Sequence, residues 1–242
     1  MSSSSTEDFA KTFGLDAVPE SVKLLTQMIT ARGADIKDFG SIIAKDKDLT
    51  ARLLKLANPR AVDEFDYNIT TVDGALQRTG MSLALVLAMG DPLIRGVVKT
   101  FQTMLDITLE CLPVTAPFNE EHILGEVGFS GKAKGKVQLR LLPSSVPIIG
   151  SRLLGLAEED LKDPAMAADV IGELCNMVAG NFKSNLCDAG LTCTLQPPKI
   201  SKTSDFKIQT IEGGNSERHP FRSKEIALFV DLGVNPWTGS ES

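Results

Sequence analysis

The period of the hydrophobic pattern changes once along this chain, and that change constrains the fold more than any other feature of the sequence. In the first part, apolar side chains recur every three or four positions, as they do along one side of a helix; "PESVKLLTQMITAR" and "DLTARLLKLAN" are examples. After residue 106, apolar and polar residues alternate in stretches such as "GKVQLRLLP". The sequence therefore predicts an α+β fold, with an all-helical N-terminal part followed by a sheet with helices laid against it.

The change falls near Asp91-Pro92, and we place the boundary between two domains there. Residues 1–92 are expected to form a helical module. Residues 93–242 are expected to form a domain with an antiparallel sheet and two long helices. Because a domain needs its own core to fold alone, removal of the helical module should leave the second domain folded.

The second domain is expected to begin with a helix around "DPLIRGVVKTFQTML", which follows an apolar helix at "MSLALVLAMGD", and to end on a strand. The expected elements are a hairpin over 122–142, helices over 144–156 and 164–187, and strands over 191–197, 205–212 and 224–232. The stretch "GGNSERHPFRS" between the last two strands is predicted to be a polar loop. The last strand, "KEIALFVDL", is predicted to lie at an edge of the sheet, where it needs cover.

Composition excludes several classes of function. The chain has 242 residues and a net charge of −6, with no basic block, which argues against nucleic acid or an anionic membrane as the main partner. No apolar run reaches the roughly 20 residues of a membrane span, and "MSSSSTEDF" does not have the pattern of a secretory signal. The four cysteines form no C-x-x-C pair, as is typical of free thiols in a reducing compartment. We therefore expect a cytoplasmic protein.

One helix carries polar residues in a pattern that calls for an explanation. In "DVIGELCNMVAGNFKSNL" the apolar residues keep helical spacing, so Glu173 and Asn176, three positions apart, should project together from another side. Gly172, Ala179 and Gly180 add little bulk around them. Taken alone, this pattern is typical of solvated residues on an amphipathic helix.

The C-terminal part, from about residue 93 to 235, resembles the chemotaxis phosphatases of the CheX, CheC and FliY kind. The residues that carry the resemblance are "TFQTMLDITLE", the hairpin "GEVGFSGKAKGKVQLRLLP" and the long helix. The helix matches the family pattern D-x-x-x-E-x-x-N-x-x-x-G-N at Asp169, Glu173, Asn176, Gly180 and Asn181. The stretch "PPKISKTSD" departs from the family, which usually has a glycine there.

The N-terminal part resembles the front of HDOD modules, helical relatives of the HD hydrolases that do not have the metal ligands. The matching stretches are "DAVPESVKLLTQMI", "DFGSIIAKDKDLTARLLKLAN" and "NITTVDGALQRTGMSLALVLAM". This part has no histidine, which excludes an HD-type metal phosphohydrolase. A binding or regulatory role is expected instead.

The CheX resemblance implies a phosphatase that hydrolyses the aspartyl-phosphate of a CheY-like response regulator. Asn176 would orient the attacking water, because a carboxamide both donates and accepts hydrogen bonds without adding charge. Glu173 would pair with the receiver's lysine. The receiver would supply Mg²⁺, so no metal or other cofactor is expected in this chain. Asp169 is expected to cap or brace this side of the helix or to be solvated, and Asn181 is expected to make a structural hydrogen bond.

Two other functions remain open at this point. The chain could be a non-catalytic adaptor that binds a receiver domain or a motility component, or a structural dimer scaffold. Because CheX-like domains pair through their sheets, the resemblance also implies a homodimer.

Overall fold

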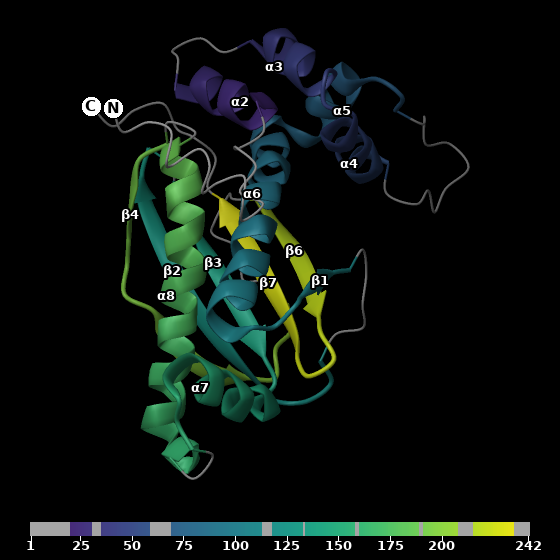
Figure 1. Cartoon of the computed structure of the whole chain (residues 1–242). Coiled ribbons are helices and arrows are strands. Elements are labelled where there is room, and N and C mark those ends of the chain that lie inside the picture. The colour runs from purple at the N-terminus through teal and green to yellow at the C-terminus, as the bar shows by residue number, and fades with distance from the viewer. Residues whose placement is uncertain are drawn as a thin grey trace.

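The structure is a computed structural model, and it describes residues 20–30, 35–58, 69–112, 118–132, 134–157, 160–188, 191–207 and 215–234. Figure 1 shows a group of short helices above a sheet, with one long helix, α6, passing from the first into the second. The combination of a helical part and an antiparallel sheet with helices confirms the predicted α+β fold.

The helical part follows the amphipathic stripes of the sequence. Its helices are α2 (Glu20–Thr30), α3 (Ile36–Ile43), α4 (Lys47–Ala57), α5 (Val72–Thr79) and the start of α6 (Met81–Leu105). Side-chain oxygens of Asp35, Asp46 and Thr71 accept hydrogen bonds from backbone N–H groups in the first turns of α3, α4 and α5. The buried faces of these helices meet in one cluster that includes Leu25, Phe39 and Leu53.

Helix α6 is continuous through the position where we place the domain boundary. The sequence predicts two helices on either side of Asp91-Pro92, but a single helix of 25 residues runs through it with Pro92 inside. Its Leu87 and Ala88 belong to the core of the helical part, whereas Leu85, Val86 and Met89 belong to the core of the sheet domain. The division at residue 92 stays a prediction, and it falls inside a helix that serves both parts.

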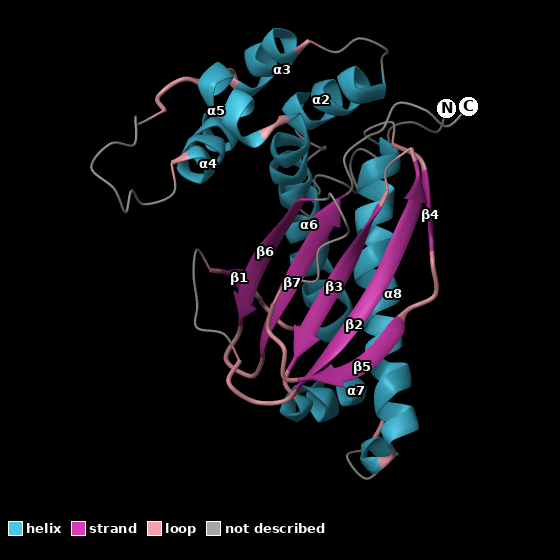
Figure 2. Ribbon diagram, turned by 180° about the vertical axis from the view of Figure 1, so that it is seen from behind, coloured by secondary structure: helices cyan, strands magenta, loops and turns pink. Residues whose placement is uncertain are grey.

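Within the described residues the sheet has seven strands, all in antiparallel pairs, in the order β1-β6-β7-β3-β2-β4, with β5 also paired to β2 (Figure 2). The strands are β1 (Glu110–Cys111), β2 (His122–Gly131), β3 (Gly135–Leu141), β4 (Cys193–Leu195), β5 (Lys199–Thr203), β6 (Asn215–Arg222) and β7 (Ala227–Val234). The predicted hairpin is confirmed as β2 and β3, in which Val127 pairs with Val137.

Two predictions about the later strands are wrong, and a third lies mostly outside the described residues. The expected polar loop over 213–223 contains strand β6, in which Pro220 pairs with Phe229. The expected strand over 205–212 begins in a bend at 204–207, its remainder lies outside the described residues, and a strand not predicted, β5, precedes it. Strand β7 lies between β6 and β3 and is therefore not an edge strand. The homodimer stays a prediction, but β7 is not available as its pairing edge.

Helices α6, α7 (Val146–Leu154) and α8 (Pro164–Asp188) cover one face of the sheet. The bounds of α7 and α8 agree with the predicted helices to within two residues, apart from a 3-10 turn at Pro143–Ser145. Side chains of Val137, Leu139, Val230 and Leu232 point to these helices and form the main core with them. No helix in the described residues is by itself long and apolar enough to cross a membrane; α5 and most of α6 pass that test only as a pair bent by 101°.

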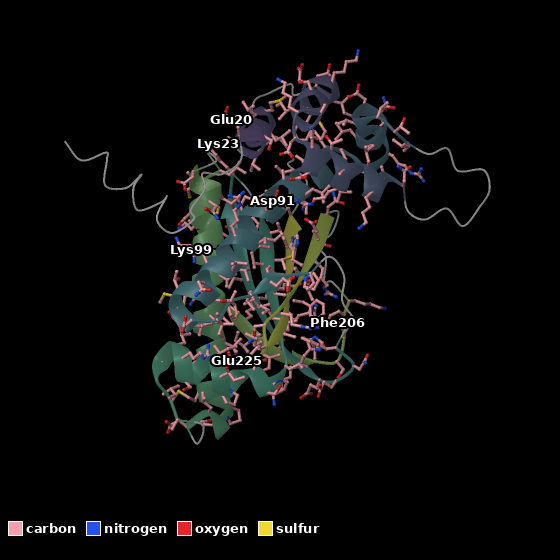
Figure 3. All side chains as sticks on the ribbon, turned by 45° about the vertical axis from the view of Figure 1, so that its right-hand side comes forward. Glu20, Lys23, Asp91, Lys99, Phe206 and Glu225 are labelled. Atoms are coloured by element: carbon pink, nitrogen blue, oxygen red, sulfur yellow. The ribbon has the colours of Figure 1, made fainter. Side chains whose placement is uncertain are left out.

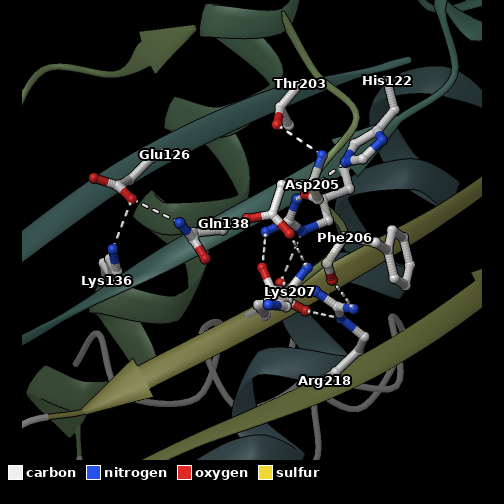
Figure 4. A network of polar contacts seen from close by, with 11 residues as sticks. His122, Glu126, Lys136, Gln138, Thr203, Asp205, Phe206, Lys207 and Arg218 are labelled. Carbon is white, nitrogen blue, oxygen red and sulfur yellow. Dashed lines mark hydrogen bonds and ion pairs between the residues drawn. The ribbon is translucent and has the colours of Figure 1, made fainter. Parts of the chain in front are cut away.

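The opposite face of the sheet carries a buried polar network (Figure 4). Arg140, which has no exposed surface, donates from Nε to Asp231 Oδ2 at 3.0 Å and from its terminal nitrogens to the backbone oxygens of Asp205 and Lys207. Arg218 donates to both oxygens of Asp231 at 2.6 Å. Because each buried charge has partners, the network fastens the segment 205–207 across the sheet, which is a structural task.

Candidate functional site

Helix α8 is placed by its first residue and by its apolar side. Asp163 Oδ1 accepts a hydrogen bond from Ala165 N at 3.0 Å, and Pro164 occupies the first helical position. The residues that face the core are Val170, Ile171, Leu174, Cys175, Val178, Ala179, Phe182 and Leu186. The opposite side of the helix is therefore turned outward along its whole length.

A glycine lets α8 lie close against strand β2. A Cβ atom at Gly125 would overlap the Sγ atom of Cys175 and approach Ile171. Cys175 is fully buried in that contact, and burial raises the pKa of its thiol to about 12. This thiol is consequently a packing group and not a nucleophile.

The outward side of α8 brings together three of the residues selected from the sequence. Asp169, Glu173 and Asn176 are all exposed, and they line the same open surface cavity of about 380 Å³. Spacings of four and three residues place these side chains on one side of a helix, and Glu173 and Asn176 lie together there as their spacing predicts. The remaining lining residues are Ala168, Gly172, Pro198 and Ile200.

Pro198 and Ile200 are not predicted from the sequence as part of the site. They come from the start of strand β5 and the turn before it, which pass beside α8 because Ile200 pairs with Gly125 on strand β2. A Cβ atom at Gly172 would lie 3.6 Å from Pro198 Cγ, in ordinary van der Waals contact. Pairing of this stretch to β2 cannot be deduced from so short a polar strand.

The other residues of the helix pattern lie elsewhere. Gly180 is half-buried, and a Cβ atom there would meet no other group within 4 Å. Asn181 Nδ2 donates to Thr100 Oγ1 on α6 at 2.7 Å, which is the structural hydrogen bond expected of it. Ala179 is buried in the core, so it does not contribute to a bare outer surface as the sequence pattern predicts.

The side chains of Glu173 and Asn176 have no fixed partner within the part of the chain that the structure describes. No hydrogen bond or ion pair joins either side chain to a described residue, whereas Arg52 on α4 and Arg152 on α7 each bind a carboxylate. The described residues also contain no group of three or more histidine, cysteine, aspartate or glutamate side chains able to hold a metal ion.

The lining of this cavity provides groups that can recognise a second molecule, but it does not provide a complete set of reactive groups. The carboxylate can accept hydrogen bonds or pair with a cation, and the carboxamide can both donate and accept. Neither histidine lines the cavity, and the four cysteines lie outside it as well. A reaction at this surface would therefore use functional groups of a second molecule.

Comparison with known proteins matches two regions of the chain to two different family models. Residues 123–222 match the model of the chemotaxis phosphatase CheX family, and residues 15–109 match the HDOD domain model. No curated protein sequence matches the chain.

Several solved structures share the fold of the sheet domain. CheX from Vibrio vulnificus and a CheC-like protein from Shewanella sp. PV-4 each give a TM-score of 0.52, at 20% and 21% identity, and each match covers 61% of this chain and 96% or 97% of the other. The CheX-CheY-BeF3-Mg²⁺ complex from Borrelia burgdorferi gives 0.50 at 20% identity, with 61% and 98% covered. Residues 15–109 thus match the HDOD family and residues 123–222 the CheX family, and this chain joins the two in one molecule.

Proposed function

We propose that this protein hydrolyses the aspartyl-phosphate of a CheY-like response regulator in chemotaxis or a related two-component pathway. The observation that carries the proposal is the exposed pair Glu173 and Asn176, which lines a cavity on α8 without any partner in the described chain. Support also comes from the CheX fold of this domain and from a relative of that fold that was solved in complex with CheY.

The division of labour depends on what each molecule can supply. Phosphoryl transfer requires in-line positioning of the nucleophile and neutralisation of charge. The receiver would supply the phosphoryl group, Mg²⁺ and a lysine, and Asn176 would supply the group that orients water. Glu173, on the same side of the helix, would pair with the receiver's lysine and set the register of docking.

The test uses candidate receivers phosphorylated with acetyl phosphate, in Mg²⁺, with and without the full-length chain. Asn176→Ala should lose on the order of 100-fold in turnover while it still binds the phosphorylated receiver, because a misplaced reacting group costs about that much. Glu173→Ala should weaken receiver binding by roughly 2–5 kcal/mol, as truncation of one member of a buried charge pair does.

Matched controls exist on the same helix. Ser184→Ala and Asp188→Ala each remove an exposed polar group from α8 outside the cavity, and both should keep turnover and binding. Circular dichroism checks that all variants remain folded. Full turnover in Asn176→Ala would refute the mechanism, and a chain that binds a receiver without accelerating its dephosphorylation would be the adaptor instead.

A further inference from the structure

A cluster of charged groups joins the helical part to the sheet domain. Arg52 on α4 donates from Nη1 to Asp91 Oδ1 on α6 at 2.7 Å and from Nη2 to both carboxylate oxygens of Glu217 on β6, at 2.8 and 2.9 Å. We call Arg52, Asp91, Glu217 and His219 the junction cluster. Figure 3 shows Asp91 at the level where the short helices meet the sheet domain. One side chain therefore holds three elements from both parts of the molecule.

The cluster fits closely against α6. A Cβ atom at Gly90 would lie 2.6 Å from Glu217 Oε2, 2.9 Å from Arg52 Nη2 and 3.1 Å from His219 Nε2. His219 is 5% exposed, and its Nε2 atom lies 3.4 Å from Glu217 Oε2 without an aligned hydrogen bond to any described residue. Because all these atoms crowd the point where a side chain at position 90 would begin, α6 has little freedom to move relative to β6 here.

Both ends of the main ion pair are charged in the folded protein. Burial disfavours the Arg52 cation, but Glu217 and Asp91 outweigh it and raise the pKa of the guanidinium. Burial likewise disfavours the Glu217 anion, but His219 and Arg52 outweigh it and lower the pKa of that carboxyl group. A charge-assisted, two-pronged contact of this kind fixes orientation as well as distance.

Helix α6 is in turn fastened to α8, the helix that carries the candidate site. Asn185 Nδ2 donates to the backbone oxygen of Pro92 at 3.0 Å, next to the Asp91 that Arg52 holds. Asn181 Nδ2 donates to Thr100 Oγ1, and Thr100 donates to the Gly96 oxygen at 2.8 Å. Gly96 also lets the helices approach, since a Cβ atom there would lie 3.5 Å from Asn181 Cβ. These bonds leave from the side of α8 opposite Glu173 and Asn176.

We propose that Arg52 is a positioning residue for the docking side of α8, acting through Asp91, α6 and the two α6–α8 hydrogen bonds. The inference rests on the proposed function in that the positioned side is the one offered to the receiver. A molecule that binds the helical part and draws Arg52 away would release α6 at Asp91-Pro92 and change the site about three turns along α8 from Asn185. The HDOD-like part is thereby a regulatory input to the phosphatase site.

The experiment compares Arg52→Ala, Arg52→Lys and Lys136→Ala in the full-length chain. Lys136→Ala is the matched control. It breaks the ion pair between Lys136 and Glu126, whose side chains are about as exposed as those of Arg52 and Glu217. That pair joins two strands to each other and does not involve α6. Hydrogen exchange is followed in peptides from 164–188. Arg52→Ala should speed exchange there by about 2- to 30-fold, the range expected for coupling along such a network. Arg52→Lys, which keeps the charge but loses the fork, should fall between wild type and alanine.

Receiver kinetics give the second readout. Arg52→Ala should lower kcat about 10-fold with a KM for the phosphorylated receiver within about 2-fold of wild type, because water positioning is more sensitive to small displacements than binding is. Unchanged exchange in 164–188 for Arg52→Ala, or an equal change for Lys136→Ala, would overturn the inference. If the wild type dephosphorylates no receiver, the proposed function fails, but the exchange result still decides whether Arg52 positions α8.

Discussion

At the scale of single residues, the structure separates charged groups that are committed to the fold from those that are free to act. Arg140, Arg218 and Asp231 satisfy one another beneath the segment 205–207, and Arg52 satisfies Asp91 and Glu217 at the junction. Glu173 and Asn176 have no such partners in the described chain. That contrast distinguishes a candidate site from a structural network where composition alone could not.

The paired carboxylates predict how stability depends on pH. The pKa of Glu217 is lowered below its ordinary 4.5, so the stability it contributes is present above about that pH and is lost as the pH falls through its lower folded value. Burial raises the pKa of Asp91 above 3.8, so its contribution runs the other way and is lost as the pH rises.

Thermal unfolding of Glu217→Gln and Asp91→Asn between pH 7 and pH 3 tests these opposite signs. Glu217→Gln should be less stable than wild type at pH 7, and the difference should shrink on acidification, because acid neutralises the wild-type group as well. For Asp91→Asn the sign is opposite, so its stability relative to wild type should not rise on acidification. A Glu217→Gln difference that stays constant down to pH 3 would contradict the assignment.

At the scale of elements, the helices and the central hairpin were predictable because their patterns are strong. Amphipathic stripes located α2 to α5, and alternation located β2 and β3. Strand β6 was missed because its stretch "NSERHPFR" is polar and contains Pro220, both typical of a loop. It is a strand because Glu217 pairs with Arg52, Glu217 and His219 both lie against Gly90 of α6, and Arg218 binds Asp231 on the other face.

Side-chain spacing predicted one side of the site and could not predict the other. The three- and four-residue intervals on α8 placed Asp169, Glu173 and Asn176 together. Pro198 and Ile200 reach the cavity only through the register of β5 on β2, which depends on contacts distant in sequence. The edge position predicted for β7 failed for the same reason, because strand order is a property of the assembled sheet.

Two glycines near the site helix predict opposite effects of the same substitution. Gly125→Ala should destabilise the protein by about 1–3 kcal/mol, because its Cβ would overlap Cys175 in a packed core. Gly180→Ala should stabilise it by about 0.5–1 kcal/mol, because a helical glycine costs backbone entropy and a Cβ there meets open space. Urea unfolding measures both; a Gly125→Ala variant as stable as wild type would show that α8 does not need this close approach.

At the scale of the whole molecule, α6 belongs to two cores at once. Ala84, Leu87 and Ala88 pack in the helical part, whereas Leu85, Val86 and Met89 on the other side of the same turns pack in the sheet domain. The limit of the independent sheet domain should therefore lie before α6 and not at residue 92.

Two truncated chains test that limit. A chain of residues 81–242 should unfold cooperatively, with its sheet-domain core complete. A chain of residues 93–242 loses Leu85, Val86 and Met89, each worth about 1.5–3 kcal/mol of burial, a sum comparable to the total stability of many domains. It should aggregate or lose its near-UV circular dichroism. Equal melting temperatures for the two chains would instead support the boundary at residue 92.

Because α6 runs through both cores, the number of residues between them along the helix fixes how the HDOD-like part is rotated relative to the sheet domain. Each residue inserted into a helix rotates the rest of that helix by about 100° and advances it by about 1.5 Å. A single insertion between Leu87 and Val97 would therefore swing the HDOD-like part around the axis and carry Arg52 away from Glu217. A chimera that replaces the HDOD-like part with another would keep Arg52 beside Glu217 only if the number of residues between the two cores along α6 is unchanged.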